Sequence, residues 1–317
     1  MPIDNSTLIP AAYLTRLDNK GLIQISGEEQ VKYLQGQVSA DLNKLTGQNA
    51  LLGCHCDFKG KTWNVFYTLQ YQDSILMLSH QESIPASLAE LKKYGVFAKV
   101  EIQQLSEQFV CLAGAGENLE HLITQTFTQM PTANQQVVSN EKGLVMALTA
   151  PRNRYLLLLK KDHAEQFIAG FGEPLNPENF WELEDIQAGI AEIRGDTSAE
   201  FVPQMMNLQA LDAISFEKGC YMGQEVIART KFLGKNKRAA FILAANQATE
   251  TKPGDNLESQ AGENWRRGGT VLRSCSVGQQ TWILAVLAKD TEIGATLRLK
   301  EKPDVLLEVL PLPYSLE

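Results

Sequence analysis

The sequence predicts an α+β fold, with two ferredoxin-like α+β units followed by a small all-β barrel. Segments typical of strands and of helices are mixed over residues 21–102, and a second mixed unit covers 109–192. After Arg238 this mixture gives way to short strand-like segments separated by turns. The chain has 317 residues, enough for two or three domains, and its apolar fraction of 44% is ordinary for a globular protein.

The first unit opens with an alternating segment over 21–26, which is typical of a half-buried strand. Gly27 then begins a short helix that runs to Gln35. Residues 50–56 and 62–69 are apolar and β-rich, and the turn between them contains a glycine, which predicts a hairpin. Further along the chain we expect a strand over 74–79, a helix over 84–95 and a strand over 96–102. This order of elements indicates a ferredoxin-like sandwich.

The second unit is predicted to begin with a strand over 109–113 and to end with a helix over 178–192, after a loop that contains two prolines. Between them we expect a helix over 117–128, strands over 143–149 and 154–160, and a helix over 162–171. The expected barrel strands cover 239–244, 269–273, 281–287 and 295–299. These changes of pattern divide the chain into three domains, over 1–105, 106–237 and 238–317.

Composition narrows the class of protein and its compartment. The net charge of −8 argues against broad, sequence-independent binding of nucleic acid, which needs a cationic surface. Five cysteines at irregular spacing do not indicate a disulfide framework, and this favours a reducing compartment. No segment approaches the roughly 18 uncharged apolar residues of a membrane helix, and the N-terminus lacks the basic start and apolar core of a signal peptide. We therefore expect a cytoplasmic protein without a membrane contact.

A cysteine between two glycines is the strongest candidate for chemistry. Residues 218–225 read Lys-Gly-Cys-Tyr-Met-Gly-Gln-Glu, and the residues that follow predict the start of a helix. Glycine lets the backbone bend sharply or approach a ligand closely. A cysteine near a helix N-terminus and a cation has a lowered pKa and is more nucleophilic. The alternative is a buried cysteine in a tight turn, because free cysteine is among the most buried residue types.

A local cationic cluster follows this motif. Positive charges without an intervening acid stand at Arg229, Lys231, Lys235, Lys237 and Arg238. A solvated surface is the ordinary explanation for such a run. Its position directly after the cysteine motif favours an anion-binding role.

Two further features have both a structural and a functional interpretation. Cys54, His55 and Cys56 suggest a metal site, but alternation along a strand puts His55 on the face opposite the two thiols. A structural zinc site usually needs four ligands, so we interpret these residues as a packed strand and predict no metal site. Trp181 is either a core residue or a stacking platform for a flat heterocycle, since aromatic faces suit such ligands.

The pattern over 218–225 resembles the hallmark of the YgfZ family, folate-binding proteins related to the T-protein aminomethyltransferase of the glycine cleavage system. Other blocks that resemble the family are 25–27, 33–38, 56–61, 91–94, 201–204, 207–211, 263–267 and 311–317. The resemblance implies an aminomethyltransferase-like fold, with two α+β domains around a central cavity and a C-terminal β-barrel. It also implies that the early domains are interleaved in sequence, with 1–105 as the folate-binding domain.

The same resemblance implies a tetrahydrofolate or folate cofactor. A tryptophan at the place of Trp181 lines the folate cavity in YgfZ-type proteins, and bacterial members can carry another tryptophan where this chain has Lys20. Gln187 stands where relatives of the T-protein carry a glutamate that contacts the pterin. Glutamine keeps an acceptor and a donor but lacks the charge. The other residues expected at the folate site are Lys218, Tyr221, Arg229 and Arg238, and the glutamate tail of folate is a suitable anion for the cationic cluster.

By resemblance, we expect a folate-binding accessory protein that supports iron–sulfur enzymes, such as those that thiolate tRNA, with Cys220 as the working thiol. Cys220 would act as a thiolate nucleophile, as a transient contact for an iron–sulfur cluster or a metal, or as a redox thiol. One thiolate alone does not hold a cluster, so a cluster contact would need a partner, a small thiol or a dimer.

Two alternative functions stay open. The first is a tetrahydrofolate-dependent aminomethyltransferase, which the expected fold favours. The second is a direct tRNA-binding module that uses the cluster from Arg229 to Arg238 together with Trp265, Arg266 and Arg267. The acidic character of the whole chain argues against direct nucleic-acid binding. The expected partners are therefore a folate derivative and iron–sulfur enzymes.

Overall fold

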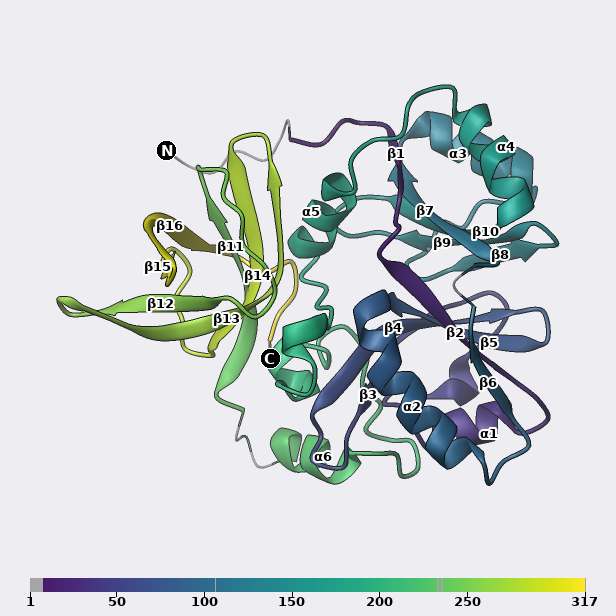
Figure 1. Ribbon diagram of the computed structural model, residues 1–317, viewed down its shortest axis with the longest axis horizontal. Coiled ribbons are helices and arrows are strands. Elements are labelled where there is room, and N and C mark those ends of the chain that lie inside the picture. Colours follow the sequence, from purple (N-terminus) through teal and green to yellow (C-terminus); the bar gives the residue numbers. More distant parts are fainter. Residues whose placement is uncertain (1–7, 106, 233, 235, 317) are drawn as a thin grey trace.

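The computed structural model describes residues 8–105, 107–232, 234 and 236–316. Figure 1 shows two sheets stacked beside each other, each with its own helices, and a barrel to one side of them. This arrangement confirms the predicted α+β class and the predicted C-terminal barrel. No helix in the described part of the chain is both long enough and apolar enough to cross a membrane.

The first sheet has five antiparallel strands in the order β3-β4-β5-β2-β6. Its strands are β2 (Lys20–Ser26), β3 (Leu51–Cys56), β4 (Thr62–Tyr71), β5 (Ser74–His80) and β6 (Glu101–Gln104). Helices α1 (Gln30–Gln35) and α2 (Ile84–Gly95) cover one face, where Leu34 and Leu91 pack with Ile23 of β2. Successive side chains of a strand point to opposite faces, so the other face is free to pack against a second sheet.

The second sheet is also antiparallel and has the order β1-β7-β10-β9-β8. Its strands are β1 (Tyr13–Arg16), β7 (Phe109–Ala115), β8 (Val137–Asn140), β9 (Gly143–Leu148) and β10 (Arg154–Lys160). Helices α3 (Glu117–Phe127) and α4 (Lys161–Phe171) cover its outer face, where Ile123 and Phe167 pack with Leu157. Because β1 pairs with β7, the described chain begins in this sheet before it builds the first one. A division at residue 105 therefore separates β1 from its own sheet.

The inner faces of the two sheets pack against each other. Leu76 of β5 and Leu156 of β10 lie in one buried cluster, together with Trp181 of α5 (Asn179–Gln187). Each sheet therefore has helices on one side and the other sheet on the opposite side (Figure 1). Burial on both faces explains the continuous apolar run over residues 155–159, which does not alternate with polar residues.

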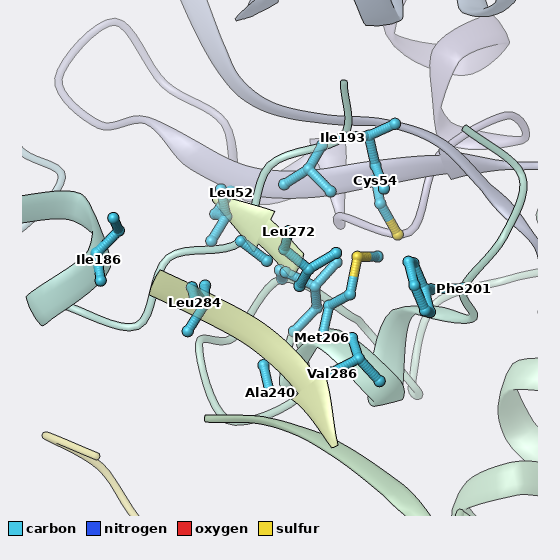
Figure 2. Close-up of a cluster of buried hydrophobic side chains, with 14 of the residues drawn as sticks. Leu52, Cys54, Ile186, Ile193, Phe201, Met206, Ala240, Leu272, Leu284 and Val286 are labelled. Atoms are coloured by element: carbon cyan, nitrogen blue, oxygen red, sulfur yellow. The ribbon is translucent and has the colours of Figure 1, made fainter. Parts of the chain in front are cut away.

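The C-terminal domain is a closed antiparallel barrel with the strand order β11-β14-β13-β12-β15-β16. Its strands are β11 (Arg238–Ala245), β12 (Asn256–Ala261), β13 (Asn264–Val277), β14 (Gln280–Ala288), β15 (Thr296–Leu299) and β16 (Lys302–Leu310). Ile283 belongs to the cluster inside the barrel, and its neighbour Leu284 belongs to the cluster outside it. Figure 2 shows the outer cluster, in which Leu284 lies with Ile186 of α5 and Cys54 of β3. This cluster joins the barrel to α5 and to the first sheet.

Several local expectations are wrong. The helix predicted over 178–192 ends at Gln187, and Gly189 then adopts a φ of +66°, which glycine accepts and which ends the helix. The strand predicted over 96–102 begins only at Glu101, since the preceding residues form a turn. Strands β1, β8, β12 and β16 were not predicted. Short 3₁₀ helices lie at Leu42–Lys44, Gln81–Ser83, Gly195–Thr197 and Pro203–Met206.

Candidate functional site

The predicted cysteine motif forms a loop that leads into α6 (Gln224–Phe232). The side chain of Cys220 is exposed, which rules out the alternative of a buried cysteine in a tight turn. Gly223 has a φ of +80°, and a Cβ at this position would lie 2.6 Å from the carbonyl oxygen of Asp57. Only glycine fits this close approach, so the second glycine of the motif sets the path of the loop against the β3–β4 hairpin.

Lys218 anchors the loop to the first domain. Its Nζ donates to the carbonyl oxygens of Val38, at 2.8 Å, and Ala40, at 2.7 Å, and it lies 5.1 Å from the centroid of the Tyr221 ring. Burial lowers the pKa of Lys218 to about 8. An ammonium with two carbonyl acceptors and a ring face is well satisfied, so this side chain positions the loop.

Tyr221 is the second anchor of the loop. It is buried in the same apolar cluster as Cys54, Cys56 and Ile227. Its hydroxyl is buried without a hydrogen-bond partner among the described residues, and burial raises its pKa. Lys218 and Tyr221 therefore point into the protein, while Cys220 between them faces solvent.

The two cysteines beneath the loop lie on β3. The Sγ atoms of Cys54 and Cys56 are 3.7 Å apart, and Cys54 Sγ lies 3.2 Å from the Oγ of Ser39. His55 points to the opposite face, where its Nδ1 is 2.9 Å from the Oγ of Ser87, and burial lowers its pKa to about 3. Among the residues that the structure describes, no group of three or more His, Cys, Asp or Glu side chains is arranged to hold a metal.

Trp181 lies on α5, between the two sheets and the barrel, and is 2% exposed. The guanidinium carbon of Arg154 lies 4.3 Å from the centroid of its ring, so one region of the indole face is already covered. Trp181 lines a cavity of about 30 Å³ together with Lys20, Tyr67 and Ser79. This volume suits a water molecule and not a pterin. The Oγ of Ser79 is buried there without a hydrogen-bond partner among the described residues.

A buried network of charges surrounds this cavity. Arg273 Nη2 lies 2.7 Å from Glu182 and 2.8 Å from Asp185, and Arg194 Nη2 lies 2.7 Å from Glu182. Lys20 forms an ion pair with Glu192. Burial acts to raise the pKa of Glu182, but the adjacent guanidinium groups outweigh it and lower that pKa to about 2. Glu182 is therefore ionised and paired at neutral pH.

Two larger grooves continue from the small cavity. The first, of about 440 Å³, shares Leu52, Tyr67 and Ile190 with the small cavity and is also lined by Tyr314. The second, of about 480 Å³, shares Leu52, Gln135 and Asp212 with the first groove. It reaches Lys44, Lys231 and the segment 215–217 that precedes the cysteine motif. A path of neighbouring cavities thus runs from the region of Trp181 to the segment that precedes the loop of Cys220.

Of the residues predicted at the folate site, Trp181 and Lys20 line the small cavity together, and Lys218 and Tyr221 contact each other in the cysteine loop. Gln187 is half-buried at the end of α5, next to Ala188, which lines the first groove. Lys218 and Tyr221 anchor the loop, as described above. Arg229 is exposed on α6, 3.5 Å from Glu225, and Arg238 is exposed at the start of β11. Lys235 of the predicted cationic cluster lies outside the described residues.

The burial of these charged side chains is not predicted from the sequence. Glu182, Glu184 and Asp185 occur on a short helix that also contains Trp181, and acidic residues normally predict an exposed face. The one signal in the sequence is that α5 has no apolar stripe of helical period. In the structure, six consecutive residues of this helix are buried. Charges all around a buried helix require partners from other elements, which here are Arg154 of β10 and Arg273 of β13.

Two sheets flanked by helices, a chain of cavities between them and a closed barrel define the class of protein with an aminomethyltransferase-like fold. The glycine cleavage system aminomethyltransferase T from Bartonella henselae matches with a TM-score of 0.73, over 96% of this chain and 87% of that chain. The sequence identity is 14%, so this likeness concerns the fold.

The sequence comparisons are more specific. Residues 236–302 match the family model described as "YgfZ, beta-barrel domain". The tRNA-modifying protein YgfZ of Pectobacterium carotovorum is 39% identical over 99% of this chain and 95% of its own length. The protein of that name from Colwellia psychrerythraea is 39% identical over 97% of this chain and 95% of its own length. This chain belongs to the YgfZ family.

Proposed function

We propose that this protein is a folate-binding accessory factor in tRNA modification, which supports iron–sulfur enzymes of tRNA thiolation and acts through the thiol of Cys220. The observation that carries the proposal is the exposure of Cys220 on a loop that Lys218 and Tyr221 anchor from both sides. An exposed cysteine held in a fixed place is accessible to a second molecule. The similarity over the full chain to proteins named tRNA-modifying protein YgfZ supports the link to tRNA modification.

The cavities support a folate site that extends beyond Trp181. Pockets for drug-sized ligands are roughly 300–1,000 Å³, and the two grooves of about 440 and 480 Å³ each reach this range. A folate with its pterin in the first groove would have Tyr67 and Tyr314 beside it. Its carboxylates would lie near Lys44 and Lys231 in the second groove. In this arrangement Trp181 borders the site through the small cavity that it shares with Tyr67.

Tetrahydrofolate titration of the purified protein tests the proposal. Ala210 lines the first groove, so Ala210→Trp is expected to fill it and weaken binding at least about tenfold. Ala89→Trp places the same indole on the exposed face of α2 and serves as the matched control. Equal affinity in the Ala210 and Ala89 variants would place the ligand elsewhere, and the absence of saturable binding to the wild-type protein would refute the folate part of the proposal.

The alternative of aminomethyl transfer is tested in the same preparation. A transferase would release ammonia and methylene-tetrahydrofolate from an aminomethyl-lipoyl donor, whereas an accessory factor binds the folate without turnover. Release of ammonia that depends on the protein would decide for the transferase.

A further inference from the structure

Two aromatic side chains are exposed near the loop of Cys220. Phe58 lies in the turn of the β3–β4 hairpin and Phe232 lies at the last position of α6, and each is 72% exposed. Neither side chain contributes to a buried cluster or lines one of the cavities described above. Exposed apolar groups bordered by polar ones mark interaction sites when they gather in one area.

The two elements that carry these residues pack against each other. A Cβ on Gly60 would lie 3.1 Å from the Cβ of Val226, so the hairpin turn packs directly against α6. The helix has nine residues, which corresponds to about 13 Å. Cys220 stands three residues before Gly223, a span of at most about 11 Å. Figure 1 shows α6 beside the end of β3 and β4 at one edge of the molecule.

The charge of this area is opposite to that of the whole chain. The hairpin turn and α6 carry four cations, Lys59, Lys61, Arg229 and Lys231, against the two acids Asp57 and Glu225, which leaves two positive charges on a chain of net charge −8. Asp57 accepts hydrogen bonds from the backbone amides of the turn, at 2.8 and 2.7 Å. The pair of Arg229 and Glu225 is exposed on both sides, with 65% and 82% of the side chains accessible, and such pairs are weak.

We propose that Phe58, Lys59, Cys220, Arg229 and Phe232 form a docking surface for an acidic protein partner. The two rings would enter an apolar recess of the partner, and the cations would face its carboxylates. This inference rests on the proposed function, in which the partner is an iron–sulfur enzyme of tRNA thiolation, and it specifies where that enzyme binds. Docking here brings the enzyme to the thiol of Cys220.

A protein fits this surface better than RNA does. Single-stranded nucleic acid also uses cations and aromatic faces, but its backbone requires a continuous positive track. Glu225 is 82% exposed beside Arg229 and would face the phosphates of a bound RNA.

The experiment measures binding of the full-length protein to a purified iron–sulfur tRNA-thiolating enzyme and, separately, to tRNA alone, at low and high salt. Two double variants test the surface: Lys59→Glu with Arg229→Glu, and Phe58→Ser with Phe232→Ser. Each is expected to weaken enzyme binding at least about tenfold, and salt is expected to weaken binding of the wild type. Lys93→Glu and Phe97→Ser, two exposed changes on and after α2, are the matched controls and should leave binding unchanged.

Three outcomes would overturn the docking surface: no binding of the wild type to the enzyme, equal binding by all variants, or binding to tRNA alone that the same variants abolish. Tetrahydrofolate titration of the double variants separates this failure from failure of the proposed function, because none of the four changed residues lines the cavity path. If the double variants bind tetrahydrofolate normally and also bind the enzyme as tightly as the wild type does, the docking surface alone is overturned. The absence of tetrahydrofolate binding to the wild-type protein would overturn the proposed function.

Discussion

Lys218 and Ala40 are 178 residues apart in the chain, and the Nζ of Lys218 donates to the carbonyl oxygen of Ala40 at 2.7 Å. A second bond from the same Nζ reaches the carbonyl oxygen of Val38. The two bonds hold the segment before Cys220 against the first domain, while the turn at Gly223 holds the segment after it. The position of an exposed thiol is thus set by buried contacts on both sides of it.

Replacement of Lys218 by Met is expected to destabilise the protein by roughly 1–3 kcal/mol, the cost of leaving buried acceptors without a partner. Met keeps the aliphatic length of the side chain but cannot donate to Val38 and Ala40. Urea unfolding at neutral pH measures the change. Lys59→Met removes an exposed lysine of the hairpin turn and should change stability by less than about 0.5 kcal/mol. A similar free energy of unfolding for both variants would show that the Lys218 contacts do not hold the loop.

The buried Lys218 also predicts a dependence of stability on pH. Burial lowers its pKa from 10.5 to about 8, so between these values the unfolded chain binds more protons than the folded one. Stability then increases with pH across this window. The free energy of unfolding of the wild type minus that of Lys218→Met should therefore increase as the pH is raised from about 8 to 10. A difference that is constant across this range would show that the lysine is not shifted.

Replacement of Arg273 by Met is expected to cost about 3–5 kcal/mol, because it leaves the carboxylates of Glu182 and Asp185 buried with fewer partners. Thermal and urea unfolding measure the loss. Arg16→Met breaks an ion pair with Asp18 in which both side chains are largely exposed, and this control should cost no more than about 1 kcal/mol. Comparable losses in the two variants would contradict the account of a buried charge network.

The same network predicts sensitivity to acid. The pKa of Glu182 is lowered from 4.5 to about 2, so its ionised form stabilises the folded state above the unfolded value. This contribution is lost as the pH falls from about 4.5 toward 2. Glu182→Gln should therefore show a shallower loss of stability over this range than the wild type, even if it is less stable at neutral pH. Circular dichroism measures the loss of folded structure of both proteins as the pH is lowered. Equal slopes for the wild type and Glu182→Gln would contradict the lowered pKa of Glu182.

Local patterns predicted much of the fold. The hairpin of β3 and β4, helix α2 and strands β9 and β10 lie close to their predicted ranges, because each has a clear period or turn signal in its own residues. Strand β1 has only four residues and pairs with β7 about a hundred positions away, and no local pattern contains that information. Gly189 stopped a helix that its surrounding residues would have continued.

The candidate site was predictable where one motif carried it. The start of α6 follows from residues 218–225, and the opposite orientation of His55 follows from strand alternation. The motif left open whether Cys220 is exposed or buried, and the structure shows it exposed. The inward direction of Lys218 and the burial of Glu182 did not follow, since a charged residue is buried only when distant parts of the chain supply its partners. Those partners are set by tertiary structure.

The central claim is that Cys220 is the working thiol, and the most direct measurement is the content of thiolated nucleosides in tRNA. Cells that lack this protein would be supplied with the wild type, with Cys220→Ser or with Cys275→Ser, and their tRNA would be digested and quantified by mass spectrometry. Because Cys220 is exposed and Cys275 is half-buried in the barrel, neither exchange should prevent folding, which equal protein levels would verify. The account predicts that Cys275→Ser restores thiolation and Cys220→Ser does not. Full restoration by Cys220→Ser would contradict it.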